Sequence, residues 1–188
     1  MKRYKNWNKN WKKTIVILSG GFDPVHIGHV RMFREAAYLG HHIIVGLNSD
    51  EWLTRKKGKP FMEFEERKEV LESIKYINQV LPFNDDDDTA CDLIQKVYDH
   101  YWNNSEFWEF EGADVDASGF MEYYDLVFAN GGDRGKDNVP EVPLCKELGI
   151  QMIWGIGGGK IQSSSDLIKN SDIEINTYGD DEWATPEN

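Results

Sequence analysis

Short apolar runs alternate with segments of helical periodicity along most of the chain. Five runs of four to six residues are rich in aliphatic side chains and are bounded by glycine or polar residues, which is typical of buried parallel strands. Between the runs, apolar residues recur every three or four positions, which predicts helices. The predicted strands are 14–18, 42–47, 79–83, 126–129 and 151–156, and the predicted helices are 29–39, 63–75, 89–98, 140–148 and 163–170.

This alternation predicts an α/β fold: a Rossmann-like, doubly wound parallel sheet of five strands in a single domain at 14–170. Ligands of such sheets bind beyond the carboxyl ends of the strands, so polar motifs directly after a strand are candidate site residues. A stretch rich in acids and aromatic side chains, 99–124, breaks the alternation, and we interpret it as a surface insertion. A basic extension, 1–13, precedes the domain, and an acidic tail, 171–188, follows it.

Charge and composition narrow the class of protein. The 188 residues carry a formal net charge of −12 and no run of 18 apolar residues, so we expect neither a nucleic-acid partner nor a membrane span. The basic first residues lack the apolar stretch of a signal peptide, which predicts a cytoplasmic protein.

We expect Cys91 and Cys145 to be buried, reduced thiols in helices. The run from Asp85 to Asp88 lacks the spacing of a calcium loop, so a solvated loop is expected there and no protein-held metal.

The strongest candidate site is the turn SGGFDPVHIGH at 19–29, between the first strand and the first helix. Glycine lets backbone N–H groups approach a phosphate, and a helix start adds free donors and partial positive charge. His26 and His29 are three residues apart, so both imidazoles can face one phosphate, and Gly28 would leave room for the ligand. Nucleotidyl transfer requires such donors at the oxygens of the attacked phosphorus. The alternative is a loop with chance histidines, one of which caps the helix.

This segment, GGFDPVHIGHV, resembles the HxGH motif of the cytidylyltransferase-like nucleotidyltransferases, and the resemblance runs from about residue 14 to 169. It implies transfer of a nucleotidyl group from a nucleoside triphosphate to a small phosphorylated acceptor, with release of pyrophosphate. The further motifs are similar to the glycerol-3-phosphate cytidylyltransferase and heptose-phosphate adenylyltransferase branches. The resemblance therefore implies a sugar or polyol phosphate as acceptor and leaves open whether the donor is CTP or ATP. It also implies Mg²⁺ on the triphosphate and a homodimer.

The resemblance implies roles for further residues. His26 and His29 would be catalytic together with Lys57 or Lys59, which would bridge the donor and acceptor phosphates. The acceptor-binding residues that it implies are Asn48, Ser49, Asp50 and Arg67. The nucleotide-binding residues that it implies are Gly20, Gly21, Phe22, Asp23, His26, His29, Gly131, Gly132, Asp133, Arg134, Ser163, Ser164 and Ser165.

Plainer interpretations stay open for these motifs. The lysines could form a solvated basic loop, Arg67 a surface ion pair on a helix, the GGDR sequence a tight turn, and the serine run an N-cap. Gly158 stands where the cytidylyltransferase branches often carry an arginine, and Lys160 lies closer to the serine run. A nucleotide-binding protein without catalysis is an alternative that the intact histidine pair disfavours. A dinucleotide-dependent oxidoreductase is disfavoured because no G-x-G-x-x-G follows the first strand, and 157–163 is not a Walker P-loop.

Overall fold

The chain folds around one parallel sheet of five strands in the order β3-β2-β1-β4-β5. The computed structural model describes residues 13–103, 124–131, 139–159 and 162–171. The strands are β1 (Lys13–Gly20), β2 (His42–Leu47), β3 (Gln79–Pro82), β4 (Tyr124–Gly131) and β5 (Gln151–Ile156). The helices are α1 (Ile27–Leu39), α2 (Asp50–Lys57), α3 (Phe64–Glu72), α4 (Cys91–Asn103), α7 (Val142–Glu147) and α8 (Ser164–Ser171). The predicted Rossmann-like α/β fold is confirmed.

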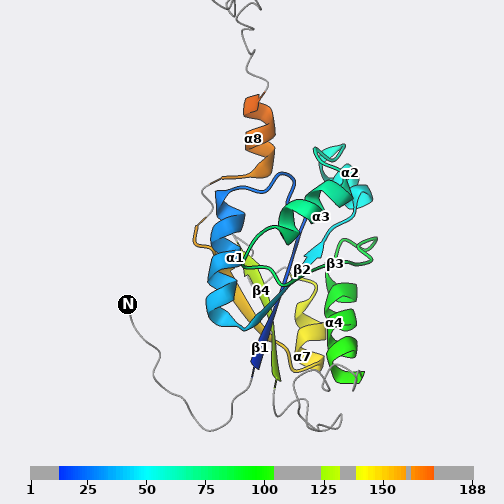
Figure 1. Ribbon diagram of the computed structural model, residues 1–188. Helices are drawn as coiled ribbons and strands as arrows, with labels where there is room; N and C mark the ends of the chain where they lie inside the picture. The colour runs from blue at the N-terminus through cyan, green and yellow to red at the C-terminus, as the bar shows by residue number, and fades with distance from the viewer. Residues whose placement is uncertain (1–12, 104–123, 132–138, 160–161, 172–188) are drawn as a thin grey trace, which may run out of the picture.

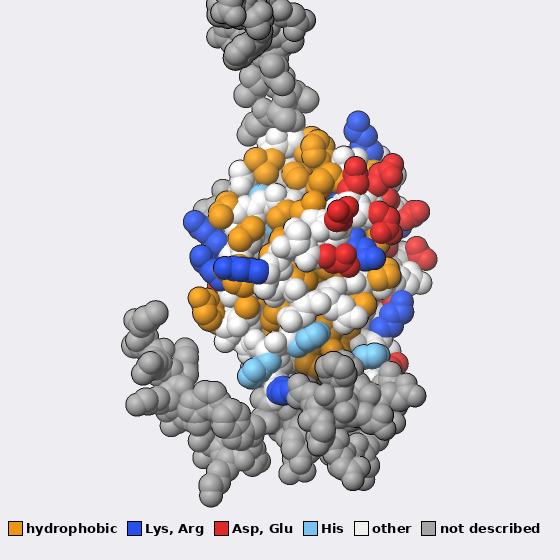
Figure 2. Space-filling model, in the orientation of Figure 1, with side chains coloured by type: hydrophobic (Ala, Val, Ile, Leu, Met, Phe, Trp, Pro, Cys, Tyr) orange, Lys and Arg blue, Asp and Glu red, His pale blue; other side chains and the backbone are white. Residues whose placement is uncertain are grey.

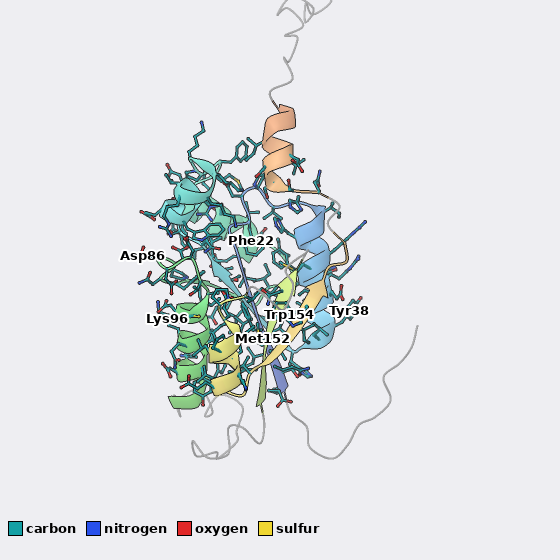
Figure 3. All side chains as sticks on the ribbon, turned by 180° about the vertical axis from the view of Figure 1, so that it is seen from behind. Phe22, Tyr38, Asp86, Lys96, Met152 and Trp154 are labelled. Carbon is teal, nitrogen blue, oxygen red and sulfur yellow. The ribbon has the colours of Figure 1, made fainter. Side chains whose placement is uncertain are left out.

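Helices cover both faces of the sheet, as Figure 1 shows, with α1 on one side and α4 and α7 on the other. Successive residues of β1 alternate between two apolar cores: Ile17 packs with α4 and α7, whereas Val16 and Leu18 pack with α1 and α3. Because both faces are buried, the strand is a continuous apolar run. Figure 3 shows the same layers from behind, with Phe22 lying between the sheet and α1.

Helix α2 occupies a segment for which the sequence analysis predicted no helix. Ser49 is its N-cap and accepts the N–H of Trp52, and Gly58 ends it with φ 92°. Acids in the first turn and bases in the last turn also favour a helix here. Periodicity missed it because only Trp52 and Leu53 are buried. Helix α1 also starts two residues earlier than predicted, at Ile27.

The predicted insertion at 99–124 is wrong at its start. Helix α4 continues to Asn103, past the predicted end at Tyr98, and Tyr101 is buried in the core. Positions 104–123 lie outside the described residues, as do the terminal segments 1–12 and 172–188. Both cysteines are in helices as predicted, but only Cys145 is buried, since Cys91 is half-buried at the start of α4.

Charge is distributed unevenly over the surface. On the face shown in Figure 2, acidic side chains gather on the side of α2, α3 and α4, whereas Lys and Arg gather on the side of α1. Asp86 projects outward from the loop before α4 (Figure 3). Within the described ranges, no helix combines the length and apolar composition needed to cross a bilayer.

Candidate active site

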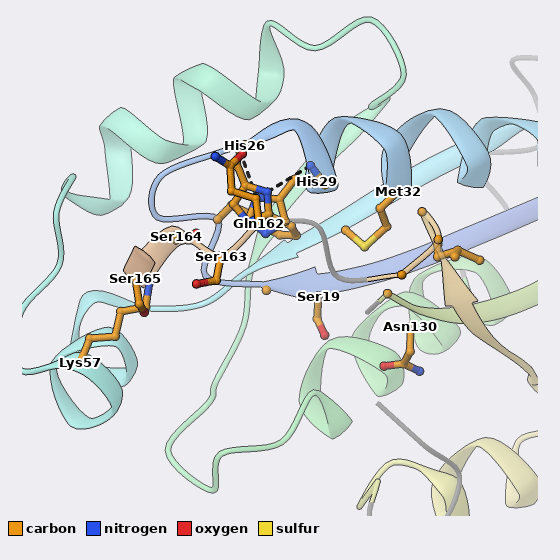
Figure 4. A pocket seen from close by; sticks show the side chains of 18 residues that line it. Ser19, His26, His29, Met32, Lys57, Asn130, Gln162, Ser163, Ser164 and Ser165 are labelled. Carbon is orange, nitrogen blue, oxygen red and sulfur yellow. Dashed lines mark hydrogen bonds between the residues drawn. The ribbon is translucent and has the colours of Figure 1, made fainter. Parts of the chain in front are cut away.

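A cavity of about 310 Å³ opens at the carboxyl ends of β1, β4 and β5, where a ligand is expected in this fold. Its walls come from the glycine turn after β1, the start of α1, the end of α2, the loop after β5 and the start of α8 (Figure 4). The lining residues are Ser19, Gly20, Phe22, His26, Gly28, His29, Met32, Lys57, Asn130, Gly131, Ile156, Gly157, Gly158, Gly159, Gln162, Ser163, Ser164 and Ser165. The size suits a small ligand of the kind that such cavities bind.

His26 and His29 form a reciprocal cap at the start of α1. The Nδ1 atom of His26 accepts the N–H of Gly28 at 3.1 Å, and the Nδ1 atom of His29 accepts the N–H of His26 at 3.3 Å. The two rings stack at a centroid distance of 3.7 Å. Because each Nδ1 accepts a hydrogen bond, the proton of each neutral imidazole is on Nε2. Capping and ligand binding are therefore compatible here, because they use different nitrogens of each ring.

Both imidazoles are held neutral. Burial, with smaller contributions from His26 and Lys57, lowers the pKa of His29 to about 3. Burial and the charge of Lys57 also lower the pKa of His26. At neutral pH each ring is therefore a hydrogen-bond donor through Nε2–H and not a proton source.

Two glycines permit close approaches beside these rings. A Cβ on Gly28 would lie 2.9 Å from Cε1 of His26, so Gly28 makes room for the His26 ring and not, as the sequence suggested, chiefly for the ligand. Gly157 has φ 84°, and a Cβ there would lie 3.0 Å from the backbone of Met32. The Glu35 carboxylate accepts the N–H of Gly157 at 2.7 Å and so fastens the loop after β5 to α1.

Lys57 brings a positive charge to the cavity from the last turn of α2. Its Nζ donates to the backbone carbonyl of Asp23 at 2.9 Å. Burial lowers its pKa, and the nearby charge of Asp23 counteracts that shift. Lys59 is exposed and lies outside the set of lining residues, so of the two predicted lysines the geometry favours Lys57.

The three serines before and within α8 line the cavity but differ in their hydrogen bonds. The Ser163 hydroxyl accepts the N–H of Asp166 and donates to its carboxylate, as an N-cap does. The Ser164 hydroxyl donates to the carbonyl of Pro24 at 2.9 Å and fastens α8 to the glycine turn. The Ser165 hydroxyl has no hydrogen bond within the described part of the chain, so it is available to a ligand.

The residues implied for acceptor binding lie beside the cavity rather than on its wall. Arg67 is fully buried, and its guanidinium donates to the backbone carbonyls of Gly21 and Asn48, to that of Met62 and to the Asp50 carboxylate. These bonds join α3 to the ends of β1 and β2. In this arrangement Arg67 braces the turn and offers no open face to a phosphate.

Asp85 corrects the prediction of a solvated acidic loop. Asp85 is 2 % exposed, and its carboxylate accepts the side-chain N–H of Asn48 at 2.9 Å and the N–H and hydroxyl of Ser49 at 2.7 Å each. It thus fixes the N-cap of α2. Asp86, Asp87 and Asp88 are exposed, as the sequence predicted.

Asp23 is also buried, and its carboxylate accepts the N–H groups of Phe61 and Met62 at 2.8 Å each. It therefore anchors the segment between α2 and α3 and does not face the cavity. We call the residues whose polar side chains are bonded within the fold the scaffold cluster: Asp23, Asn48, Asp50, Arg67 and Asp85. All are buried except Asp50, whose side chain is 33 % exposed. We call the polar residues with atoms left for a ligand the cavity cluster: His26, His29, Lys57, Asn130 and Ser165.

The structure gathers part of the predicted nucleotide site and adds residues that the sequence analysis missed. Gly20, Phe22 and Gly131 line the cavity, whereas Gly21 does not. Gly132, Asp133 and Arg134 lie outside the described residues. The lining residues to which the sequence analysis gave no role are Ser19, Met32, Asn130, Ile156, Gly157, Gly158, Gly159 and Gln162. Position at a carboxyl end of a strand is the signal that could have identified Asn130.

The sequence is similar to a family model and to curated proteins. The model of the cytidylyltransferase-like family matches residues 17–158. Glycerol-3-phosphate cytidylyltransferase of Bacillus subtilis is 33 % identical over 84 residues, which are 45 % of this chain and 65 % of that protein. Bifunctional protein HldE of Coxiella burnetii is 40 % identical over 87 residues, which are 45 % of this chain and 18 % of that protein. The matches thus span just under two thirds of the first relative and under a fifth of the second.

A solved structure supports the fold. The bifunctional NMN adenylyltransferase/ADP ribose pyrophosphatase from Francisella tularensis, complexed with AMP and a manganese ion, superposes with a TM-score of 0.53 at 16 % sequence identity. The superposition covers 84 % of this chain and 41 % of that one.

Proposed function

The chain belongs to the cytidylyltransferase-like family, and we propose that it is a nucleotidyltransferase that joins a nucleotidyl group to a small phosphorylated acceptor and releases pyrophosphate. One observation carries the proposal: both His26 and His29 accept a backbone N–H at Nδ1 and are neutral, which leaves two Nε2–H donors at the cavity. Donors held in place before the reaction stabilise the charge that develops on a phosphate.

In the proposed reaction, an acceptor phosphate oxygen attacks the α-phosphorus of the triphosphate. A bond forms between that oxygen and the phosphorus, the bond from the phosphorus to the bridging oxygen of the β-phosphate breaks, and pyrophosphate leaves. The attacking oxygen is already anionic, so no general base is needed. His26 and His29 donate to the α-phosphate oxygens, and Lys57 adds positive charge between donor and acceptor.

The β- and γ-phosphates would lie at the start of α8, where helix N–H groups and the Ser165 hydroxyl reach the cavity. Among the described residues, no carboxylate lines the cavity and no three potential metal-binding side chains form a cluster. These residues do not build a protein-held magnesium site. We therefore expect Mg²⁺ to enter as the counter-ion of the triphosphate, with phosphate and water as its ligands.

The acceptor is proposed to be a sugar or polyol phosphate, because the relatives include a protein named glycerol-3-phosphate cytidylyltransferase. CTP and ATP are both candidate donors, because three residues of the GGDR turn, Gly132, Asp133 and Arg134, lie outside the described residues. A homodimer is a further prediction, which the mass of the protein in solution would test.

The decisive experiment measures pyrophosphate release from CTP and ATP against glycerol 3-phosphate and a panel of phosphorylated sugars. The expected result is acceptor-dependent pyrophosphate in one combination, with the nucleotidyl-acceptor product in equal amount. His29→Ala, purified in the same way, controls for contaminating enzymes. Release of orthophosphate, or nucleotide binding without turnover for every acceptor, would contradict the proposal.

A further inference from the structure

Asn130 at the carboxyl end of β4 has a buried donor without a partner. The residue is 4 % exposed, and its Nδ2 atom has no hydrogen bond to any residue that the structure describes. The residue nevertheless lines the cavity. A buried N–H group without a partner is costly, so a sheet residue of this kind needs an explanation.

A matched residue shows that the unpartnered donor is not a general property of this edge. Asn48 follows β2 and is similarly buried, at 6 % exposed, yet its Nδ2 atom donates to the Asp85 carboxylate at 2.9 Å. The fold therefore provides a partner for the buried carboxamide at the end of β2. At the end of β4 it leaves the corresponding donor unpaired.

The place of Asn130 also favours a ligand. β1 and β4 are neighbours at the centre of the sheet, where the strand order changes direction, and crevices at this point hold the ligands of doubly wound folds. Ser19 lies near it on β1, and Figure 4 shows the Ser19 and Asn130 side chains projecting to the same side of the sheet, away from Met32. The two polar side chains thus form the part of the wall that lies across the sheet from the histidine pair.

We propose that Asn130 is a substrate-recognition residue whose Nδ2–H group donates to an oxygen of a bound phosphorylated substrate. This inference rests on the proposed function. The shared chemistry is an oxygen acceptor on a phosphate or sugar, and it could belong to the nucleotide or to the phosphorylated acceptor. Asn130 takes no part in bond making, so its loss weakens binding more than turnover.

The experiment compares Asn130→Leu with Asn48→Leu, since leucine has nearly the shape of asparagine and no polar atoms. Asn130→Leu removes an unsatisfied donor, so its Tm should equal or exceed that of the unaltered protein. Asn48→Leu removes a donor that is bonded in the fold, so its Tm should fall. Asn130→Leu should raise the KM for one substrate by about tenfold to a hundredfold with a smaller change in kcat, as loss of a hydrogen bond to a charged group does.

The assay has separate arms for the two substrates: KM for CTP or ATP at saturating glycerol 3-phosphate, and KM for glycerol 3-phosphate at saturating nucleotide. A rise in the first places Asn130 at the nucleotide, and a rise in the second places it at the acceptor. If no pyrophosphate is released, that outcome contradicts the proposed function but not the role of Asn130. The role of Asn130 is then tested by calorimetric titration of Asn130→Leu and the unaltered protein with CTP and ATP. Asn130→Asp, which keeps the shape, serves if Asn130→Leu fails to fold. Unchanged KM values and nucleotide affinity, or a lowered Tm with unchanged binding, would overturn the role of Asn130.

Discussion

The cavity cluster and the scaffold cluster lie at the same edge of the sheet and contain similar polar side chains, but they differ in how their hydrogen-bonding atoms are used. Arg67 is buried and bonded to three backbone carbonyls and a carboxylate. His29, by contrast, uses Nδ1 for the cap of α1 and keeps Nε2 for the cavity. A residue's place in a sequence motif therefore does not show whether it binds a ligand or stabilises the fold of this chain. The number of its hydrogen-bonding atoms that are already bonded within the fold does.

This difference has a consequence for mutagenesis. Altering the scaffold cluster leaves buried polar groups without partners, so the free energy of unfolding should fall. Altering the cavity cluster removes hydrogen-bonding groups that are available to a ligand, so turnover or ligand binding should fall while the free energy of unfolding changes little. The following variants separate the two clusters, beginning with the largest expected effect.

Arg67→Met should lower the free energy of unfolding by about 3–5 kcal/mol, because it leaves the Asp50 carboxylate and three carbonyls without their donor. We expect a loss of about 3 kcal/mol, because the Asp50 side chain is 33 % exposed and water can partly replace its lost partner. Urea denaturation followed by circular dichroism measures the change. Lys96→Met is the control: the Lys96 side chain is 55 % exposed, and loss of its ion pair with Asp92 should lower the free energy of unfolding by at most about 1 kcal/mol. A stable Arg67→Met with a raised KM for the acceptor would instead support direct acceptor binding.

His26→Asn should lower kcat by about two to three orders of magnitude, because removal of one donor to a transition-state oxygen costs roughly 2.7–4 kcal/mol. Asparagine is a good N-cap, so its side chain still accepts the N–H of Gly28, but it is too short to replace Nε2. The Tm should therefore stay near that of the unaltered protein. His26→Ala, which also loses the cap, should show the same kcat and a lower Tm. If His26→Asn retained full turnover, His26 would be a structural cap only.

The sequence predicted the sheet well because each strand of this fold is apolar on both faces and bounded by turns, as at 14–18 and 42–47. It predicted α2 poorly, since a helix with two buried residues has little periodicity. The HxGH turn drew attention to His26 and His29, which do line the cavity. The bracing roles of Asp85 and Arg67 could not be predicted, because they depend on contacts between residues 36, 37 and up to 46 positions apart.

Ser165→Ala should raise the KM for the nucleoside triphosphate by an amount that corresponds to about 1.5–3 kcal/mol, the usual loss for a hydrogen bond to a charged group. Its Tm should not change, because the hydroxyl has no partner within the described ranges. Ser164→Ala is the matched comparison, and it should also lower the Tm because it breaks the bond to Pro24. Initial rates at varied triphosphate and fixed acceptor give both KM values. A larger effect on the KM of the acceptor would contradict the placement of the triphosphate at α8.

The smallest expected effect is a fall in the free energy of unfolding of the protein at acid pH, caused by His29 of the cavity cluster. His29 has a pKa of about 3 in the folded protein and an ordinary value of 6.5 in the unfolded chain. Above pH 6.5 it is neutral in both states and makes no pH-dependent contribution. Between pH 6.5 and about 3 the unfolded chain binds a proton that the folded protein does not, so stability falls with falling pH. From pH 7.5 to 5.0 the loss attributable to His29 is at most on the order of 2 kcal/mol.

His29→Gln keeps an acceptor for the N–H of His26 and does not titrate, so it should lose less stability over this range. His26 and His42 titrate in both proteins, and subtracting the two urea-denaturation series cancels their contributions to first order. If the free energy of unfolding changed equally with pH in the two proteins, the His29 imidazole would be solvated. His29 would then belong to neither the cavity cluster nor the scaffold cluster.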